Sequence, residues 1–257
     1  MDFRQTYSIV TEEFDKWRPR YCPELFAEVI RYAQIGPHSR VLEIGPGTGQ
    51  ATEPFLRTGC EYHAVELSPV FVEHMQKKYG AYPNLHMHCG EFEQFAPGDG
   101  RFDLVFSAAT IQWIPEQTAF SRCNALLRPG GVLAMFMTRT DERTPNAAFY
   151  GRIQQAYDEF FRPETRYNCR LDYTRAVEYG FEDFHYMDWK RRTVFSAQEY
   201  VQYLAATQVE HITLKEPWRT RFFDAVYAAV AESGNKMTLE DTIALYLCRK
   251  GEGEAAR

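Results

Sequence analysis

Three glycines at alternate positions form the first candidate binding site in the sequence. Gly45, Gly47 and Gly49 follow the apolar segment 41–44 and lead into a stretch with helical spacing that closes at Gly59. Glycine tolerates positive φ angles and lets a ligand approach the backbone closely, so a glycine turn before a helix suits a bound anion or nucleotide. A dinucleotide fingerprint places its third glycine three residues after the second. Here the third glycine comes too early, which disfavours a pyrophosphate site.

A carboxylate follows near the end of the next apolar segment. Glu66 lies in segment 62–67, just before a helix that we expect to begin with Ser68 as its cap and Pro69 at its first position. In a nucleotide-binding α/β fold, an acidic residue at the end of the second strand accepts hydrogen bonds from the hydroxyls of a ribose. The alternative is that Glu66 only caps the helix. Its position and residue type together favour the ribose role and predict a nucleoside ligand.

The segments around these motifs predict alternating strands and helices. Short apolar stretches typical of strands alternate with amphipathic stretches such as 23–34 and 117–127, and a Pro-Gly-Gly turn at 128–131 precedes the fifth strand. The five expected strands cover residues 41–44, 62–67, 85–89, 102–107 and 132–137. Parallel strands need crossover connections, so this order predicts a Rossmann-like, doubly wound α/β sheet with helices on both faces. Ligands bind such sheets beyond the carboxyl ends of the strands.

The remainder of the chain predicts a cap and two further strands. We expect one domain over residues 1–257, with a mostly parallel seven-stranded sheet whose last strand is antiparallel. Its parts are an N-terminal lid and first helix at 1–36, a cofactor-binding core at 40–138, a helical cap at 140–180 and 197–235, and strands at 184–195 and 237–249. We expect residues 249–257 to form a polar tail.

Composition and charge disfavour several classes of binding partner and several cellular compartments. The net charge of −6 disfavours binding to a nucleic acid backbone. No apolar run is long enough to span a membrane, and the first ten residues are too polar for a secretory signal. The six cysteines are scattered singly, so reduced thiols and a cytoplasmic location are expected. The sequence leaves the oligomeric state open.

Five sequence blocks resemble the class I S-adenosylmethionine-dependent methyltransferases. They are VLEIGPGTGQ, VELS, CGEFEQF, FDLVFSAATIQWI and LLRPGGVLAMF, which occur in the family's order over about residues 40–137. The resemblance implies a methyltransferase with S-adenosylmethionine as its cofactor. The C-terminal half, through FSAQEYVQYLAATQ and LEDTIALYLCRK, is similar more loosely to a small-molecule subgroup that contains trans-aconitate methyltransferase.

The resemblance also implies roles for individual residues. The three glycines would face the methionine half of the cofactor, Glu66 its ribose, and Glu91 with Phe92 its adenine, because a carboxylate can accept from the exocyclic amine while a backbone N–H donates to a ring nitrogen. Glu93 is expected to be solvated. Many relatives carry Asp where Glu91 stands. The complete set of cofactor-binding candidates is Tyr7, Arg18, Glu43, Gly45, Gly47, Thr48, Gly49, Glu66, Leu67, Glu91, Phe92 and Ser107.

The same resemblance suggests a lid and an acceptor site. YSIVTEEFDKWRPRYCPELF is similar to a lid segment in which Arg18 would pair with the cofactor carboxylate and Tyr7 would cover the site, although both residues could equally just tether the segment. Gln112 and Trp113 are the substrate-binding candidates, with simple packing as the alternative for Trp113. The subgroup often has His where Gln112 stands, so no catalytic acid or base is assigned.

A metal site is not expected from the sequence. His86 and His88 share one face of a strand, but no third ligand is close in sequence and methyl transfer needs no metal, so burial within the strand is the favoured interpretation. We expect a small-molecule acceptor, for which a carboxylic acid is one candidate, and no nucleic acid or membrane partner. The competing functions are an NAD-dependent oxidoreductase and a non-catalytic S-adenosylmethionine-binding module.

Overall fold

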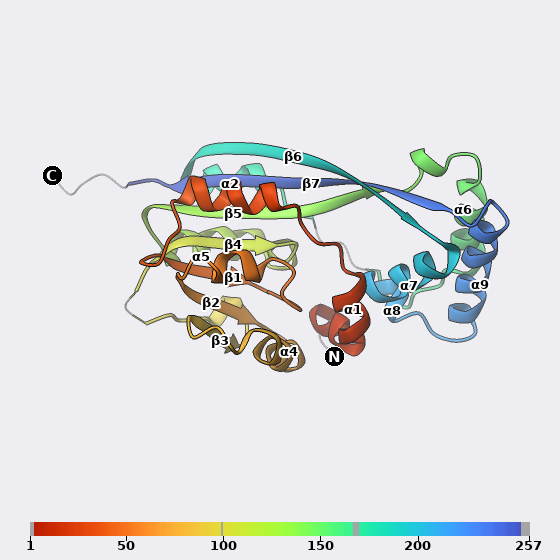
Figure 1. Cartoon of the computed structure of the whole chain (residues 1–257), viewed down its shortest axis with the longest axis horizontal. Helices are drawn as coiled ribbons and strands as arrows, with labels where there is room; N and C mark the ends of the chain where they lie inside the picture. Colours follow the sequence, from red (N-terminus) through yellow and green to blue (C-terminus); the bar gives the residue numbers. More distant parts are fainter. Residues whose placement is uncertain (1–2, 99, 167–169, 253–257) are drawn as a thin grey trace. The chain divides into compact units, whose positions relative to one another are not determined.

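The computed structural model describes residues 3–98, 100–166 and 170–252 (Figure 1). The chain divides into two compact units. The sheet unit comprises Arg20–Met137, Cys169–Asp188 and Ile243–Arg257, and the helical unit comprises Met1–Pro19, Thr138–Asn168 and Trp189–Thr242. Among the described residues, no helix combines the length and the apolar character that crossing a membrane requires.

A seven-stranded sheet, mostly parallel with one antiparallel strand, confirms the predicted fold class. Its strands lie in the order β3-β2-β1-β4-β5-β7-β6. β1 pairs in parallel with both β2 and β4, β2 with β3, and β4 with β5. In Figure 1, β7 runs opposite to its neighbours. The strands are β1 (Arg40–Ile44), β2 (Glu61–Glu66), β3 (Leu85–Cys89), β4 (Phe102–Ala108), β5 (Leu127–Asp141), β6 (Phe181–Phe195) and β7 (Met237–Lys250).

Helices of the sheet unit cover both faces of the parallel strands. On one face, Phe26 of α2 packs edge-on against Phe136 of β5, and Phe55 of α3 lies 4.4 Å from the ring of Phe106 in β4. On the other face, Phe120 and Cys123 of α5 belong to a buried apolar cluster that includes residues of β1, β4 and β5. These helices are α2 (Pro23–Ala33), α3 (Thr52–Leu56), α4 (Pro69–Tyr79) and α5 (Glu116–Leu126), with 3-10 turns η2 (Phe92–Gln94), η3 (Ile111–Trp113) and η5 (Tyr173–Tyr179).

Local sequence signals explain where several of these helices begin and end. α2 and α4 both have proline in their first turn, as predicted, and α2 ends where Gln34 adopts a left-handed conformation at φ 54°. The predicted capping by Ser68 is wrong in detail. Ser68 occupies the N-cap position of α4, but its hydroxyl makes no cap hydrogen bond. Its backbone N–H donates to Glu66 instead.

The predicted turn at residues 128–131 lies inside β5. The pairing of β4 with β5 steps from Phe102 opposite Leu127 to Leu104 opposite Val132, so the intervening residues form an irregularity in the ladder. Gly130 takes a φ of +70° there. The Pro-Gly-Gly signal thus coincides with a break in the regular pairing of β5 with β4, where the glycines supply the backbone freedom that a turn also needs.

The helical unit has its own apolar core. Side chains of α6, α7 and α9 fill it, including Ile153, Tyr200 and Phe222, all fully buried. A capping box between Ser196 and Glu199 starts α7. The unit contains η1 (Phe3–Val10), α1 (Thr11–Trp17), η4 (Thr144–Asn146), α6 (Tyr150–Phe160), α7 (Ala197–Thr207), α8 (Val209–Ile212) and α9 (Trp218–Ala231). Of the predicted cap and tail, residues 167–169 and 253–257 lie outside the described residues, as do residues 1–2 of the predicted lid.

Candidate functional site

The glycine turn follows β1 at the carboxyl end of the parallel strands. Gly45, Gly47 and Gly49 all have positive φ angles, of 63°, 59° and 83°. A Cβ atom on Gly45 would lie 2.3 Å from Cγ2 of Thr110, and one on Gly49 would lie 2.4 Å from a ring carbon of Tyr79. Two of the three positions are therefore fixed as glycine both by backbone conformation and by neighbouring side chains.

Glu66, the last residue of β2, lies against the glycine turn. Its Oε2 accepts from the Gly47 N–H at 3.1 Å and its Oε1 from the Ser68 N–H at 2.8 Å. Burial raises the pKa of this carboxyl to about 7, against the lowering effect of the backbone donors at Ser68, Gly47 and Leu67. The structure thus brings Glu66 and the predicted glycines together, and the hydrogen bonds to its carboxylate from the described residues come from backbone N–H groups.

Glu43 is a fully buried acid beneath the same turn. Its Oε2 accepts from Thr52 Oγ1 at 2.6 Å and from the hydroxyl of Tyr62. Its Oε1 has no hydrogen-bond partner within the part of the chain that the structure describes. Burial raises its pKa to about 7, and the negative charge of Glu66 contributes. In its ionised form, Glu43 therefore offers one unused acceptor atom at the site.

The predicted adenine residues follow β3, next to β2. Gly90 continues the strand pairing by donating to the Glu66 carbonyl at 2.9 Å, and Glu91 comes directly after it. The Glu91 carboxylate accepts from Gln94 at 3.0 Å and remains half-buried. The Phe92 ring is buried in the core beneath α5, so the backbone of Phe92 is the part available to a ligand. Glu93 is half-buried rather than fully solvated.

The loop after β4 closes the other side of the turn. Ser107 is fully buried, and its hydroxyl accepts from the Ile111 N–H at 2.9 Å. Thr110 donates to the Gly45 carbonyl at 3.0 Å, which ties this loop to the glycine turn. Gln112 donates to the Ala109 carbonyl at 3.0 Å, and Trp113 is half-buried. The predicted acceptor residues thus stand on a loop bonded to the predicted cofactor residues.

Residues that the sequence analysis did not single out hold the turn in place. Tyr79 donates to the Gly49 carbonyl at 3.0 Å, and Lys78 donates to the carbonyl of Thr48 at 2.9 Å. Thr48 itself is fully buried, and Leu67 is half-buried. Lys78 and Tyr79 end α4 about 30 residues after the turn, so sequence proximity gave no signal for them.

Tyr7 and Arg18 belong to the helical unit. The Tyr7 ring packs 4.8 Å from the ring of Phe14, and the Arg18 guanidinium lies 5.7 Å from the same ring. The backbone N–H of Arg18 donates to the Phe14 carbonyl at 2.9 Å. Both side chains are half-buried around one aromatic ring of α1. Their role as lid residues stays a prediction.

Four adjacent parallel strands therefore deliver the candidate residues to one edge of the sheet. The carboxyl ends of β1, β2, β3 and β4, or the residues just after them, carry respectively the glycine turn, Glu66, the Glu91–Phe92 segment and the Ser107–Trp113 segment. Hydrogen bonds from Gly47 to Glu66 and from Thr110 to Gly45 connect them. Such an edge can hold a nucleoside by a carboxylate and by backbone groups.

Comparisons with known proteins agree with this arrangement. Residues 42–135 match a family described as a methyltransferase domain. The malonyl-[acyl-carrier protein] O-methyltransferase 1 of Ilyobacter polytropus is 35% identical over 97 residues, which cover 37% of this chain and 36% of that protein. A ubiquinone biosynthesis O-methyltransferase of Xanthomonas oryzae pv. oryzae is 28% identical over 186 residues, which cover 65% of this chain and 74% of that protein.

A solved structure shares the fold over nearly the whole chain. Phosphoethanolamine N-methyltransferase 2 of Haemonchus contortus, in complex with S-adenosylhomocysteine, has a TM-score of 0.58 at 16% identity, and the match covers 98% of this chain and 60% of that one. Likeness at this identity concerns the fold. The chain spans 36% to 56% of the length of several curated relatives that it matches, including uncharacterized mycobacterial methyltransferases.

Proposed function

We propose that this chain, whose residues 42–135 carry a class I methyltransferase domain with S-adenosylmethionine as its cofactor, transfers a methyl group to a small-molecule acceptor. The observation that carries the proposal is the contact between Glu66 and the glycine turn at the carboxyl ends of β1 and β2. Two elements of a nucleoside site meet there: a carboxylate at the end of a strand, and a glycine turn whose backbone a ligand can approach closely.

The chain's own groups fit the cofactor's functional groups. The Glu66 oxygens can accept from two ribose hydroxyls, and the buried Glu43 Oε1 can accept from an ammonium group, directly or through water. Glu91 and the Phe92 backbone serve the adenine in this proposal. Tyr7 and Arg18 keep the lid role that the sequence resemblance implies.

The cofactor supplies an activated sulfonium methyl group, so the protein's task is to align the acceptor in line and exclude water. The predicted acceptor loop presents an amide and an indole at Gln112 and Trp113, neither of which is a base at neutral pH. A carboxylate acceptor is already ionised near neutral pH and needs no base. We therefore propose a small organic acid as the acceptor class, as in the trans-aconitate methyltransferase-like subgroup.

The names of two relatives support the acceptor class in this proposal, and the free thiols support the cytoplasm as the compartment. One relative is named malonyl-[acyl-carrier protein] O-methyltransferase 1 and another ubiquinone biosynthesis O-methyltransferase. The described cysteines, Cys22, Cys60, Cys89, Cys123 and Cys248, are all free thiols, which suits the cytoplasm.

The test combines ligand binding with turnover. S-adenosylmethionine and S-adenosylhomocysteine are expected to raise the melting temperature of the full chain, because a ligand that binds the folded state stabilises it by mass action, while NAD leaves it unchanged. Radiolabelled S-adenosylmethionine is then incubated with a panel of di- and tricarboxylic acids, phenols, amines and bulk RNA. We expect label in at least one carboxylic acid.

The panel separates the alternatives. Stabilisation by NAD alone would favour an oxidoreductase and contradict the cofactor assignment. Binding of S-adenosylmethionine with no labelled acceptor in any class would favour a non-catalytic binding module. Label in RNA or in phenols alone would contradict the organic-acid acceptor and leave the methyltransferase assignment standing.

A further inference from the structure

Four polar side chains gather on one face of β2 and β3, away from the glycine turn. Glu61 and His63 stand two residues apart on β2, so they share a face, and His86 and His88 do the same on β3. The parallel register places His63 directly beside His86. β3 is an edge strand of the sheet. Spacing along the sequence gave no third ligand for His86 and His88, because Glu61 and His63 come from the neighbouring strand.

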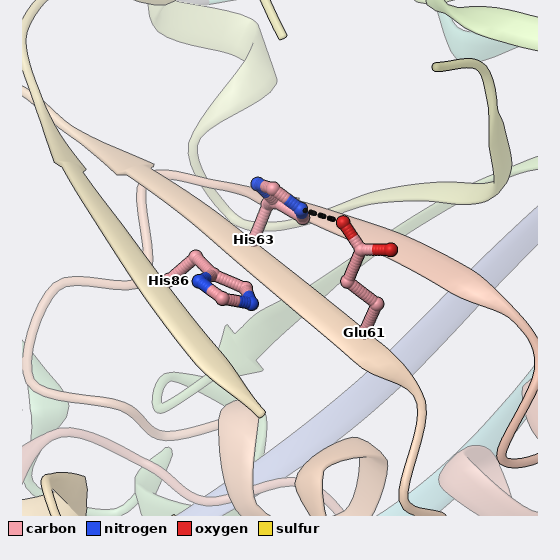
Figure 2. Close-up of side chains that lie close together, drawn as sticks. All are labelled: Glu61, His63 and His86. Atoms are coloured by element: carbon pink, nitrogen blue, oxygen red, sulfur yellow. Dashed lines mark hydrogen bonds and ion pairs between the residues drawn. The ribbon is translucent and has the colours of Figure 1, made fainter. Parts of the chain in front are cut away.

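Three of the four side chains lie at distances that suit a shared ion (Figure 2). One ligand atom from each of Glu61, His63 and His86 lies within 4.8 Å of the others. Oε1 of Glu61 is 2.7 Å from Nε2 of His63. A tetrahedral ion with bonds of about 2.1 Å holds its ligand atoms about 3.4 Å apart. Small rotations of the two exposed side chains, Glu61 and His86, bring the set to that spacing.

Neighbouring residues orient two of the three ligands, His63 and Glu61. Nδ1 of His63 lies 2.9 Å from Nε2 of His88. When His63 Nδ1 carries the proton and donates to His88, the lone pair on His63 Nε2 points to the ion, an outer-shell arrangement common for metal-bound histidine. Arg40 Nε lies 3.1 Å from Oε2 of Glu61, which leaves Oε1 for the ion.

Packing also fixes the position of His63, the central member. Its side chain is only 8% exposed, and its ring meets the ring of Phe102 at 5.4 Å. His88 is held in turn by Phe95, with ring centroids 4.9 Å apart. One rigid ligand and two solvent-exposed ligands give an ion a preformed anchor and a path of entry from solvent.

The cluster is separate from the proposed cofactor site. Glu61 is the first residue of β2 and Glu66 is the last. Five residues of extended chain span about 17 Å, so the two sites lie at opposite ends of the strand. An ion at the cluster would therefore bridge β2 to the edge strand β3 without touching the cofactor.

We propose that Glu61, His63 and His86 form a Zn²⁺ site, with His88 as an orienting residue and water as the fourth ligand. Two imidazoles and one carboxylate suit Zn²⁺, whereas Mg²⁺ prefers oxygen ligands alone. The bound ion links the two outermost parallel strands and stabilises the folded chain by mass action. This site is independent of the proposed methyl transfer.

The test measures Zn²⁺ binding to the full chain by calorimetry and Co²⁺ binding by its visible absorption. Wild-type protein is expected to bind one Zn²⁺ per chain, with a rise in melting temperature, and to show no response to Mg²⁺. His86→Thr removes an exposed ligand and keeps a residue suited to a strand. We expect it to weaken Zn²⁺ binding more than about 100-fold, and His88→Phe to weaken it by about 10- to 100-fold, the range of orienting partners.

A matched control separates the site from ordinary surface histidines. His185 is exposed on β6 and lies 2.9 Å from Asp183, so it pairs with a carboxylate as His63 does. His185→Thr is expected to bind Zn²⁺ as wild type does, and S-adenosylhomocysteine affinity is expected to be the same in all variants. Equal Zn²⁺ affinity in wild type and His86→Thr, equal losses in His86→Thr and His185→Thr, or no Zn²⁺ binding to wild type would overturn the proposal.

Discussion

At the scale of single residues, the ionisation of Glu66 should control cofactor affinity. Burial raises its pKa to about 7 in the ligand-free protein, and donors from a ribose favour the ionised carboxylate. Binding is therefore expected to weaken as the pH falls below 7, by up to about tenfold per pH unit. Calorimetry with S-adenosylhomocysteine between pH 8 and pH 6 measures this slope.

Two variants isolate the carboxylate. Glu66→Gln removes the ionisable group, so its affinity should be lower at pH 8 and lose most of the slope. Glu93→Gln alters a neighbouring acid outside the contacts of Glu66 and should keep the wild-type slope. A wild-type affinity that is flat across this range, or a Glu66→Gln variant that retains the full slope, would show that Glu66 does not contact the ribose.

The sequence predicted the place of Glu66, whose ribose role stays a prediction, because an acid at the end of a strand is a local pattern. It gave no indication that Glu43 would accept from Thr52 and Tyr62, because these partners meet only when β1, β2 and α3 pack together. The expectation that His86 is buried was wrong, since its side chain is exposed on the edge strand. Burial in a strand depends on its place in the sheet, which period-two spacing does not specify.

At the scale of elements, α4 and the glycine turn form one packed unit. Gly49 has a φ of +83°, and an added Cβ would lie 2.4 Å from the Tyr79 ring and 2.8 Å from Met75 Sδ. Gly49→Ala is therefore expected to lower the free energy of unfolding by about 2 kcal/mol or more, through backbone strain and overpacking together. It should also weaken cofactor binding, because α4 and the turn must shift apart.

Gly36→Ala is the matched control for this effect. Among the described residues, apart from the glycine and its chain neighbours, no atom lies within 4 Å of a Cβ at Gly36, so the unfolding free energy of Gly36→Ala should differ from wild type by less than about 0.5 kcal/mol. Urea denaturation of both variants, with calorimetry of S-adenosylhomocysteine, makes the comparison. Equal stability of the two variants would contradict the packing role of Gly49.

The sequence located most elements of the sheet because their signals are local and periodic. β1 to β4 lie within about a residue of their predicted bounds. The extension of β5 through the irregularity in its pairing with β4 and the short helix α8 escaped prediction. A Pro-Gly-Gly segment usually ends a strand, and only the register against β4 shows that β5 pairs with β4 on both sides of this one.

At the scale of the whole molecule, the buried Glu43 ties stability to pH. The pKa of its carboxyl rises from an ordinary value of 4.5 to about 7 in the folded chain. The folded state therefore holds the proton more tightly than the unfolded state does. The protonated Glu43 carboxyl therefore contributes to the free energy of unfolding. That contribution is fully present below pH 4.5 and is lost as the pH rises through 7, which lowers the free energy of unfolding by up to about 3 kcal/mol. Glu66, with its pKa also raised, acts in the same direction.

Three partly or fully buried histidines, His63, His88 and His211, have lowered pKa values because of burial. They act in the opposite sense, since their contribution to the free energy of unfolding is lost as the pH falls.

The difference in unfolding free energy between wild type and Glu43→Gln removes this effect of the histidines, because both proteins carry the same histidines. Glutamine keeps the hydrogen bonds to Thr52 and Tyr62 and cannot ionise. Unfolding free energies from urea denaturation at pH 5, 6, 7 and 8 should show wild type losing stability relative to Glu43→Gln as the pH rises. Glu53 is an exposed acid whose pKa is lowered by Arg57. Glu53→Gln should therefore gain no unfolding free energy relative to wild type as the pH rises from 5 to 8. A constant difference between wild type and Glu43→Gln from pH 5 to pH 8 would mean that Glu43 is not protonated in the folded chain.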